Sequence, residues 1–440
     1  MDASLSYSQA VEALSQMAPR GWRRALDRMH NLTERLNVPL GGQPAYFHVA
    51  GTNGKGSTTA FLQSGLTAQG FRTGSTYSPY VLDLRERIQV DGEWISEADF
   101  ARLMSQLLPI SAAMEATELG APTEFEAKIA LAMMHWNEQG CEAVALETGL
   151  GGRLDSTNIV DPACSIITSI GFDHMHILGD TIEQIAAEKA GIIKPGRPVV
   201  VGDLPEAATE VIRQYAREQG AEAFFWDEDF FTEGGRLVLP FAGDDLRLPL
   251  PAYLKGDKQR HNQILAAVAL IAAEFCRDPD LMTQGLKTAW LPGRFQKIRR
   301  HAGRLTQPDP GGTTLVIDGA HNEEAARTLA NTWKSELKGH LGTLVVGMLD
   351  GHEPEPFLRN IASCVKRVVV VPVDSPRAMP TSRVIEAAEN IKLRTESSPD
   401  LREAISRLLT EDQGPILIAG SVYLSGEACR LLGATQPEIL

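Results

Sequence analysis

The stretch that decides the fold is Ala50-Gly51-Thr52-Asn53-Gly54-Lys55-Gly56-Ser57. An apolar run (Tyr46 to Val49) precedes it and an amphipathic run (Thr58 to Leu66) follows it, which predicts a strand, a tight turn and a helix. Glycines let the backbone fold closely around a polyphosphate, so that its N–H groups point at the oxygens. Lys55 would bring a positive charge to the outer phosphates. The stretch therefore predicts a nucleoside triphosphate site, although Gly56 separates Lys55 from Ser57, unlike the common G-x-x-x-x-G-K-[ST] spacing.

Short apolar runs alternate with longer amphipathic runs on both sides of this loop, which is typical of a parallel sheet covered by helices. Further strands are expected at Ala143–Leu146, Ser165–Ser169 and Pro198–Val201, and a second series at Leu315–Ile317, Leu344–Val346, Val368–Val371 and Ile416–Ile418. The fold class is α/β, with an N-terminal P-loop-type domain (residues 1–295) and a smaller Rossmann-like domain (residues 296–440) after Pro292-Gly293. The segment 224–250 reads as strands or hairpins at the edge of the first domain.

Size and charge agree with a two-domain enzyme of 440 residues, 43% of them hydrophobic. The net charge of −14 disfavours partnership with nucleic acid or acidic membranes. Five scattered cysteines suggest buried reduced thiols rather than disulfides or a zinc site. The N-terminus lacks a signal pattern, and no stretch approaches the length of a membrane span, so a cytoplasmic protein is expected.

Several polar clusters follow expected strands in the first domain, where side chains can converge on the phosphate loop. They contain Ser78, Glu147, Asp155 and His174, and Lys189 lies near the end of an expected helix. Hydroxyl and carboxylate oxygens suit Mg²⁺, and a histidine at the same sheet edge could complete its shell. Each cluster also has an interpretation without a function. Ser78-Pro79 could form an ordinary turn, and the glycines after Glu147 could close a tight turn. His174 could be a solvated or hydrogen-bonded residue, and Lys189 a surface lysine.

Three further polar groups in the C-terminal half flank expected strands or the connection between the two domains. Arg294 could reach a phosphate, and Asp318 could accept from ribose hydroxyls, with His321 close by. The alternatives are a surface arginine and, for Asp318, an N-cap of the helix that begins near Asn322. Ser375-Pro376-Arg377 is the third group.

These blocks, in this order, resemble the folylpolyglutamate synthase family, including members that are also dihydrofolate synthases, within the Mur-type ligases. The resemblance runs through most of the chain and rests on ordered motifs: G-T-N-G-K-G-S at Gly51, S-P at Ser78, E-R-I at Glu86, E-T-G-L-G-G-R-L-D-S-T-N at Glu147, D-H at Asp173, E-K-A-G-I at Glu188, P-G-R-F at Pro292, D-G-A-H-N at Asp318 and S-P-R-A at Ser375.

The resemblance implies an ATP-dependent ligase that joins glutamate to a carboxylate of dihydropteroate or tetrahydrofolate. By position, Thr52, Asn53, Gly54, Lys55, Gly56 and Ser57 would hold the triphosphate, and Asn262, Arg294, Asp318 and His321 the rest of ATP. Ser78, Glu147 and His174 would bind Mg²⁺, and a carbamylated Lys189 would help to hold a second Mg²⁺; Lys55, Lys189 and His174 are the expected catalytic residues. Substrate contacts are expected at Thr123, Phe125, Glu126, Leu154, Asp155, Ser375 and Arg377. A monomer is the default for the family.

Two departures from the family pattern concern the pterin side and a C-terminal loop. Ala25-Leu26-Asp27-Arg28-Met29 lacks the glycine that commonly precedes L-x-R, and Gly347-Met348-Leu349-Asp350-Gly351-His352-Glu353 replaces the usual G-M-L-x-D-K-D. Two other functions stay open at this stage: a Mur-type ligase with a different acid substrate, and a nucleotide-dependent switch protein. For a ligase, phosphorylation of the acid by ATP to an acyl phosphate is the expected mechanism, because a free carboxylate is a poor acceptor for an amine.

Overall fold

The computed structural model describes residues 5–17, 25–242, 247–249, 254–411 and 414–436. The chain forms two compact units, which comprise the described residues within 1–80, 84–253 and 260–289, and those within 81–83, 254–259 and 290–440. Both are α/β, as the sequence predicts. The domain boundary near residue 295 and the roles given to each domain stay predictions.

The first unit is built on an eight-stranded sheet with the order β4-β3-β2-β5-β1-β6-β7-β8. Its strands are β1 (Ala45–Ala50), β2 (Thr73–Thr76), β3 (Gln89–Val90), β4 (Glu93–Trp94), β5 (Ala143–Glu147), β6 (Pro162–Ile167), β7 (Val199–Val201) and β8 (Ala223–Phe225). The six strands from β2 to β8 in this order run parallel, and β3 and β4 form an antiparallel margin. The expected strands at 46–49, 143–146, 165–169 and 198–201 are thus confirmed.

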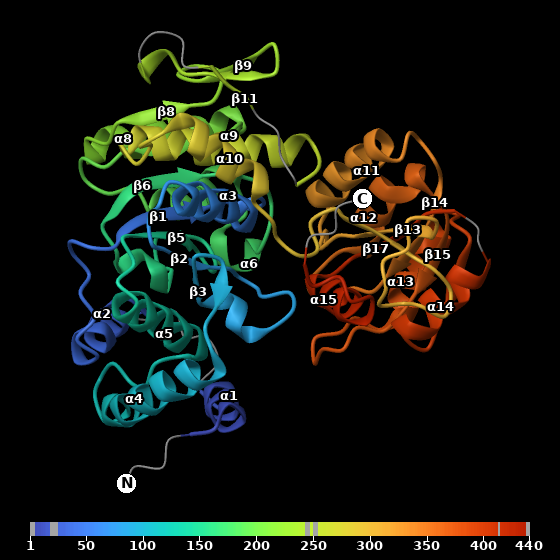
Figure 1. Cartoon of the computed structure of the whole chain (residues 1–440), viewed down its shortest axis with the longest axis horizontal. Coiled ribbons are helices and arrows are strands. Elements are labelled where there is room, and N and C mark those ends of the chain that lie inside the picture. The colour runs from blue at the N-terminus through green and yellow to red at the C-terminus, as the bar shows by residue number, and fades with distance from the viewer. Residues whose placement is uncertain (1–4, 18–24, 243–246, 250–253, 412–413, 437–440) are drawn as a thin grey trace. The chain divides into compact units, whose positions relative to one another are not determined.

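Helices cover both faces of this sheet (Figure 1). They are α1 (Tyr7–Ser15), α2 (Ala25–Arg35), α3 (Lys55–Ala68), α4 (Glu97–Glu115), α5 (Glu124–Glu138), α6 (Met175–Leu178), α7 (Ile182–Ala190), α8 (Glu206–Gln219), α9 (Asp257–Ala272) and α10 (Pro279–Thr288), with 3₁₀ turns at Leu84–Arg87, Ser156–Ile159 and Pro240–Ala242. On one face Tyr46, Val144 and Leu146 pack with α1, α2, α4 and α5. On the other face the ring of Phe47 meets that of Phe275 edge-on, with centroids 5.3 Å apart.

The segment after β8 forms the antiparallel strands expected from its alternating pattern. They are β9 (Phe231–Glu233), β10 (Arg236–Val238) and β11 (Arg247–Pro249), which make a small sheet of their own. Residues 243–246 and 250 of the predicted segment lie outside the described residues.

The second unit contains a six-stranded sheet with the order β12-β13-β17-β14-β15-β16, in which only the pair β12–β13 is antiparallel. Its strands are β12 (Gln296–Arg300), β13 (Thr313–Ile317), β14 (Gly342–Val346), β15 (Val365–Val370), β16 (Thr395–Ser397) and β17 (Ile416–Ala419). Its helices are α11 (Glu323–Glu336), α12 (Pro354–Ile361), α13 (Thr381–Asn390), α14 (Leu401–Glu411) and α15 (Val422–Leu431), with a 3₁₀ turn at Ala362–Cys364. All four strands expected here are present.

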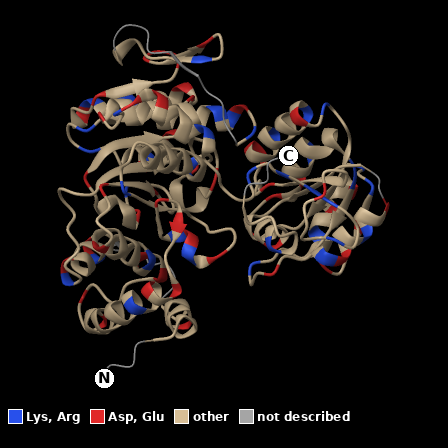
Figure 2. Ribbon diagram, in the orientation of Figure 1, with Lys and Arg blue, Asp and Glu red and all other residues tan. Residues whose placement is uncertain are grey.

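Charged residues lie mainly on helices and loops, while the central strands carry few of them (Figure 2). Within β1, β5, β6 and β7, Glu147 at the end of β5 is the one Asp, Glu, Lys or Arg. Because a buried carboxylate is costly without partners, this position marks the carboxyl edge of the sheet as a site.

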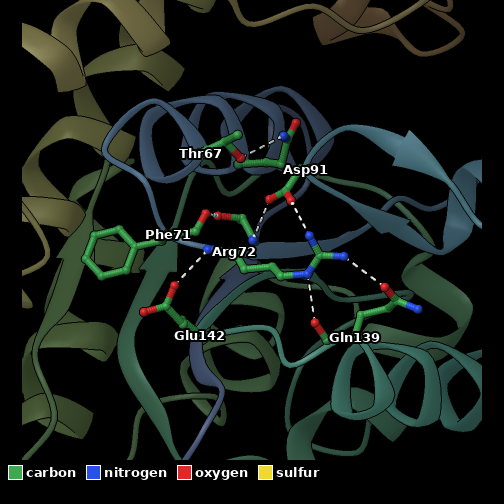
Figure 3. A network of polar contacts seen from close by, with 8 residues as sticks. Thr67, Phe71, Arg72, Asp91, Gln139 and Glu142 are labelled. Carbon is green, nitrogen blue, oxygen red and sulfur yellow. Dashed lines mark hydrogen bonds and ion pairs between the residues drawn. The ribbon is translucent and has the colours of Figure 1, made fainter.

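The opposite, amino edge of the sheet is tied by a polar network centred on Arg72 (Figure 3). Its guanidinium donates to Asp91 and to the carbonyl and side-chain oxygens of Gln139, at 2.7–3.3 Å. The backbone N–H of Arg72 donates to Glu142, which directly precedes β5. This network joins β2 to the entry of β5 and lies at the strand ends away from Glu147, so its role is structural.

Candidate active site

The phosphate loop connects β1 to α3 and is held by the segment that follows β6. The N–H groups of Thr52 and Asn53 donate to Ser169, at 2.8 Å to its carbonyl and 2.9 Å to its hydroxyl oxygen. The Thr168 hydroxyl donates to the Asn53 carbonyl at 2.7 Å. A Cβ on Gly51 would lie 1.9 Å from Thr168 Oγ1, so only glycine allows this close approach.

The last turn of the loop explains its second glycine. Gly54 has φ +88°, a left-handed conformation that favours glycine, and it is the N-cap of α3. The buried Asn262 lies against it, because a Cβ on Gly54 would be 2.5 Å from Asn262 Oδ1. The helix N-terminus at Lys55 to Ser57 thus follows directly on the loop, which is the arrangement that binds phosphate elsewhere.

Two lysines meet at this loop. Lys55 Nζ donates to the Gly51 and Thr52 carbonyls at 2.9 and 3.1 Å, and Lys189 Nζ, from α7, donates to the same Gly51 carbonyl at 3.0 Å. Lys189 is 3% exposed. Its burial lowers its pKa to about 7, and the charge of Lys55 acts in the same direction, against the carboxylates of Asp173, Asp155 and Glu188. Lys189 is therefore a buried amine with an accessible neutral form, not a surface lysine.

Ser78 and Glu147 also come together. The Ser78 N–H donates to Glu147 Oε2 at 2.8 Å, and Arg87 Nη2 donates to Ser78 Oγ at 3.3 Å. Glu147 and Arg87 are both buried. Ser78 and the buried carboxylate of Glu147 are thus adjacent at the carboxyl end of β5, where oxygen ligands would suit a metal ion.

His174 differs from its predicted partners because its side chain is 44% exposed. It has φ +48° and precedes the short helix α6. Its Nε2 lies 3.8 Å from Asp173 Oδ1, and its ring lies beside that of His176. Among the described residues no group of three or more His, Cys, Asp or Glu side chains could hold a metal. Of the predicted metal ligands, only Glu147 and His174 belong to these residue types, so this absence does not test the predicted magnesium site. The assignment of these ligands stays a prediction.

The glycine-rich turn after Glu147 is anchored by Asp155. Asp155 Oδ2 accepts from the N–H groups of Gly149 and Leu150 at 3.0 and 2.8 Å, and Oδ1 accepts from the N–H and hydroxyl of Thr157 at 3.0 and 2.6 Å. Each carboxylate oxygen therefore already accepts two hydrogen bonds. Leu154 is 36% exposed, and so free of the core.

The residues predicted for the pterin side lie at the start of α5. Thr123 is the N-cap, and its hydroxyl and the Glu126 carboxylate form a capping box. Glu126 also accepts two hydrogen bonds from the buried Arg28, at 2.7 and 2.8 Å. Phe125 lies over Gly149, since a Cβ there would be 2.4 Å from its Cζ. Thr123 and Glu126 thus have structural partners, while the half-buried ring of Phe125 remains the better surface for a flat ligand.

In the second unit the predicted nucleotide residues form a cluster at the carboxyl end of β13. The Asp318 carboxylate accepts from the N–H groups of Phe295 and Ala320, at 2.7 and 2.8 Å. Burial raises the pKa of Asp318, while the nearby charge of Arg294 opposes this. A Cβ on Gly319 would lie 2.5 Å from Arg294 Nη1, and the His321 ring bonds to the Gly319 carbonyl at 2.8 Å.

The alternative that Asp318 caps a helix is wrong. The N-cap of α11 is Asn322, whose side chain accepts from the Ala325 N–H at 2.9 Å. Asp318 instead joins the loop before β12 to the loop after β13, because its two backbone donors come from those two segments.

Ser375 and Arg377 lie in the loop after β15. The Ser375 hydroxyl accepts from the Arg377 N–H at 3.2 Å, and the Arg377 carbonyl accepts from the Asp350 N–H at 2.8 Å. The exposed Arg377 guanidinium lies 5.9 Å from the centre of the Tyr423 ring. The loop at 347–351 that departs from the family pattern is therefore paired with the loop that carries Arg377.

Sequence comparisons agree with this geometry. Residues 49–270 match the family described as the Mur ligase middle domain, and residues 304–431 match the dihydrofolate synthetase C-terminal domain. The dihydrofolate synthase/folylpolyglutamate synthase of Bacillus subtilis is 36% identical over 438 residues, which cover 95% of this chain and 97% of that protein. The chain belongs to the dihydrofolate synthase/folylpolyglutamate synthase family. The prediction of an ATP-dependent ligase of the Mur type is confirmed, and the nucleotide-switch alternative is wrong.

Two solved structures share the fold. An Escherichia coli protein in complex with DHPP and ADP has a TM-score of 0.84 at 27% identity, with 99% of both chains covered. A bifunctional enzyme with Mn, AMPPNP and L-glutamate bound has a TM-score of 0.81 at 30% identity, with 98% of both chains covered. In the described part of this chain, no helix has the length and apolarity needed to cross a membrane.

Sequence reasoning missed four polar residues with a place in this site. Arg28, Arg87 and Thr157 stand within noted motifs but were given no role, and His48 was not singled out. A signal existed for one of them, since a histidine inside the apolar run 46–49 has to be buried. The partners of Arg28 and Thr157 come from distant or folded-back segments, which no local pattern reveals.

Proposed function

We propose that this ligase is bifunctional and joins the α-amino group of L-glutamate to the carboxylate of dihydropteroate and to that of tetrahydrofolates, including polyglutamates. The observation that carries the choice of two acceptors is the near full-length similarity to a single chain with both activities in its name. The alternative of a Mur-type ligase with another acid substrate is not supported by the name of this relative.

ATP first activates the acceptor. An acceptor carboxylate oxygen attacks the γ-phosphorus, the bond to the ADP oxygen breaks, and an acyl phosphate results. The neutral amine of glutamate then attacks the acyl carbon, the bond to the phosphate oxygen breaks, and the nitrogen loses a proton as the amide forms. Lys55 would stabilise the charge that develops on the transferring phosphoryl group.

Nucleotide binding would use the loop from Thr52 to Ser57, with Asn262 at the adenine. Arg294 would contact phosphate, Asp318 the ribose hydroxyls, and His321 the phosphates. The ADP bound to the Escherichia coli relative supports a nucleotide site in this fold. The Asp318 carboxylate accepts hydrogen bonds from two backbone N–H groups, and these donors and the charge of Arg294 oppose the rise in its pKa that burial causes.

Ser78, Glu147 and His174 would hold Mg²⁺, and Mn bound to a relative supports a divalent ion. The residues fit such an ion, because Glu147 is buried and its carboxylate accepts a hydrogen bond from the Ser78 N–H, which places Ser78 beside it. When bound, the ion would neutralise the triphosphate and orient it for transfer. A second Mg²⁺ would use Lys189 as a carbamate, for which a buried amine with a pKa of about 7 is suited.

The acceptor would lie on Phe125, with Thr123, Glu126, Leu154 and Asp155 around it. Glutamate, which is bound in a solved relative, would be held with the help of Ser375 and Arg377. The exposed guanidinium of Arg377 is able to pair with a carboxylate. A monomer and a cytoplasmic location are part of this proposal.

The test is ADP release by the purified chain with ATP, Mg²⁺ and glutamate, with dihydropteroate or tetrahydrofolate added separately and products identified by mass. Release with both acceptors is expected. ADP release with only one acceptor would show that the enzyme has only that activity. Release with neither acceptor would contradict the proposal and favour a ligase with a different acid substrate.

A further inference from the structure

A buried chain of polar side chains runs from β1 to the glycine-rich turn. His48 Nε2 lies 2.8 Å from Thr157 Oγ1, which lies 2.6 Å from Asp155 Oδ1. The other Asp155 oxygen accepts from the N–H groups of Gly149 and Leu150. All three side chains are buried, with His48 and Thr157 fully so.

The direction of each hydrogen bond in this chain follows from its members. A carboxylate only accepts, so the single Thr157 hydroxyl proton goes to Asp155. The Thr157 oxygen must then accept from His48, which is assigned as the tautomer with hydrogen on Nε2. Burial lowers the pKa of His48 to about 3, with a further contribution from Lys194, so the ring is neutral.

Packing alone does not explain a histidine here. His48 Nδ1 is buried and has no hydrogen-bond partner in the described part of the chain. Burial of an unsatisfied polar group costs about 1–3 kcal/mol, which an aliphatic side chain would avoid. We therefore infer that the hydrogen bond from His48 Nε2 to Thr157 has a role that offsets this cost.

The turn held by Asp155 touches three parts of the candidate site. It begins one residue after Glu147, and its Gly149 lies under Phe125. On its other side Gly152 lies against α7, since a Cβ would be 2.8 Å from the Glu188 carbonyl and 3.1 Å from Lys189 Cα. The Arg153 N–H also donates to the Glu188 carbonyl at 2.7 Å. A shift of this turn would therefore reach Glu147 and Lys189 together.

We propose that His48 and Thr157 are positioning residues, which act through Asp155 to hold the glycine-rich turn so that Glu147 and Lys189 keep the alignment needed for divalent-metal binding. This rests on the proposed function for the roles of Glu147 and Lys189. Asp155 acts on the turn through both of its oxygens, because each of them accepts two hydrogen bonds from protein donors.

The test compares two pairs of variants in the full chain. Thr157→Val and His48→Leu remove the hydrogen bonds, whereas Thr157→Ser and His48→Gln keep a donor at about the same place. Arg72→Met is the control, since its network lies at the other sheet edge. Three quantities are measured: the melting temperature, Mn²⁺ affinity in the presence of AMPPNP by electron paramagnetic resonance, and kcat and KM.

We expect Mn²⁺ affinity and kcat to fall about 10- to 100-fold in Thr157→Val and His48→Leu, the range typical of residues that orient metal ligands. Thr157→Ser and His48→Gln should recover most of both, and Arg72→Met should change only the melting temperature. If Thr157→Val does not fold, the His48 pair carries the test.

Wild-type Mn²⁺ affinity in the two disruptive variants, or no recovery in the two conservative ones, would overturn the inference. A wild-type chain without ligase activity would instead contradict the proposed function. The Mn²⁺ comparison would still decide the role of His48 and Thr157.

Discussion

Lys55 and Lys189 donate to one and the same acceptor, the carbonyl oxygen of Gly51 in the phosphate loop. Two ammonium groups so close repel each other, and burial adds to the penalty on the deeper one. The pKa of Lys189 falls to about 7 for these two reasons, with burial the larger. The arrangement gives Lys189 a neutral form near pH 7, which in the proposed mechanism is the form that reacts with CO₂.

The first prediction concerns the carbamate. Only the neutral amine attacks CO₂, so Lys189 should carry a carbamate near neutral pH in bicarbonate buffer, detectable by ¹³C NMR. Lys189→Arg keeps the charge but cannot form a carbamate, and kcat should fall by at least about 100-fold. Unchanged turnover in this variant would remove the carbamate from the mechanism.

The second prediction is a pH dependence of stability. The folded-state pKa of Lys189, about 7, is below the ordinary value of 10.5, so the unfolded chain binds more protons between these pH values. The contribution of Lys189 to the free energy of unfolding therefore rises with pH from 7 to 10.5, and it is lowest below pH 7. In CO₂-free buffer, Lys189→Met should raise the free energy of unfolding by a few kcal/mol, on the order of the shift, at pH 6 and much less at pH 10. Urea unfolding at both pH values measures this, and an equal effect at both would contradict it.

The third prediction concerns Lys55. Lys55→Met should lower kcat by about 10²- to 10³-fold, because the charge that stabilises phosphoryl transfer is lost. It should also raise the pKa of Lys189, since one of the two causes of its depression disappears. The pH at which half of Lys189 reacts with CO₂ should move upward. If that midpoint were the same in Lys55→Met and in the wild-type chain at one CO₂ concentration, the two lysines would not interact as described.

The fourth prediction concerns Glu147. Glu147→Gln keeps an acceptor for the Ser78 N–H but removes the negative charge. The Mg²⁺ concentration needed for half-maximal activity should rise by about 10-fold or more, with little change in the melting temperature. A loss of stability without a change in the Mg²⁺ requirement would show that Glu147 is a structural residue.

The fifth prediction separates the two sheet edges. Arg72→Met removes the side-chain hydrogen bonds to Asp91 and Gln139. Because the guanidinium is partly exposed, the cost should be only about 1 kcal/mol. The melting temperature should fall while kcat and the KM values for ATP, glutamate and the acceptor stay at wild-type levels. A drop in kcat would show that the amino edge of the sheet is coupled to catalysis.

Local patterns in the chain were sufficient for the elements that depend on neighbours in sequence. The strand–loop–helix of residues 45–68 is such a case, because its apolar run, its glycines and its helical run are all local. Glu147 was recognisable for the same reason, as a carboxylate that ends an apolar strand. The alternation of apolar and polar residues after β8 predicted strands or hairpins there. It did not predict that these strands form a sheet of their own.

The pairings between distant segments lay beyond such patterns. Arg28 binds Glu126 across 98 residues, and His48 meets Thr157 across 109. The burial that depresses the pKa of Lys189 depends on how α7 packs beneath the phosphate loop, and a lysine in an amphipathic run carries no sign of it.

The amino-acid sequence by itself thus determined the fold class, the phosphate loop and the family of this protein, because periodicity, glycine positions and ordered motifs are local properties of the chain. Only the tertiary structure decided that Lys189 is buried against Gly51, that both carboxylate oxygens of Asp155 accept hydrogen bonds from protein donors, and that Asn322 is the N-cap of α11. Those facts arise from desolvation and from hydrogen bonds between segments that folding brings together, and neither exists until the chain is packed.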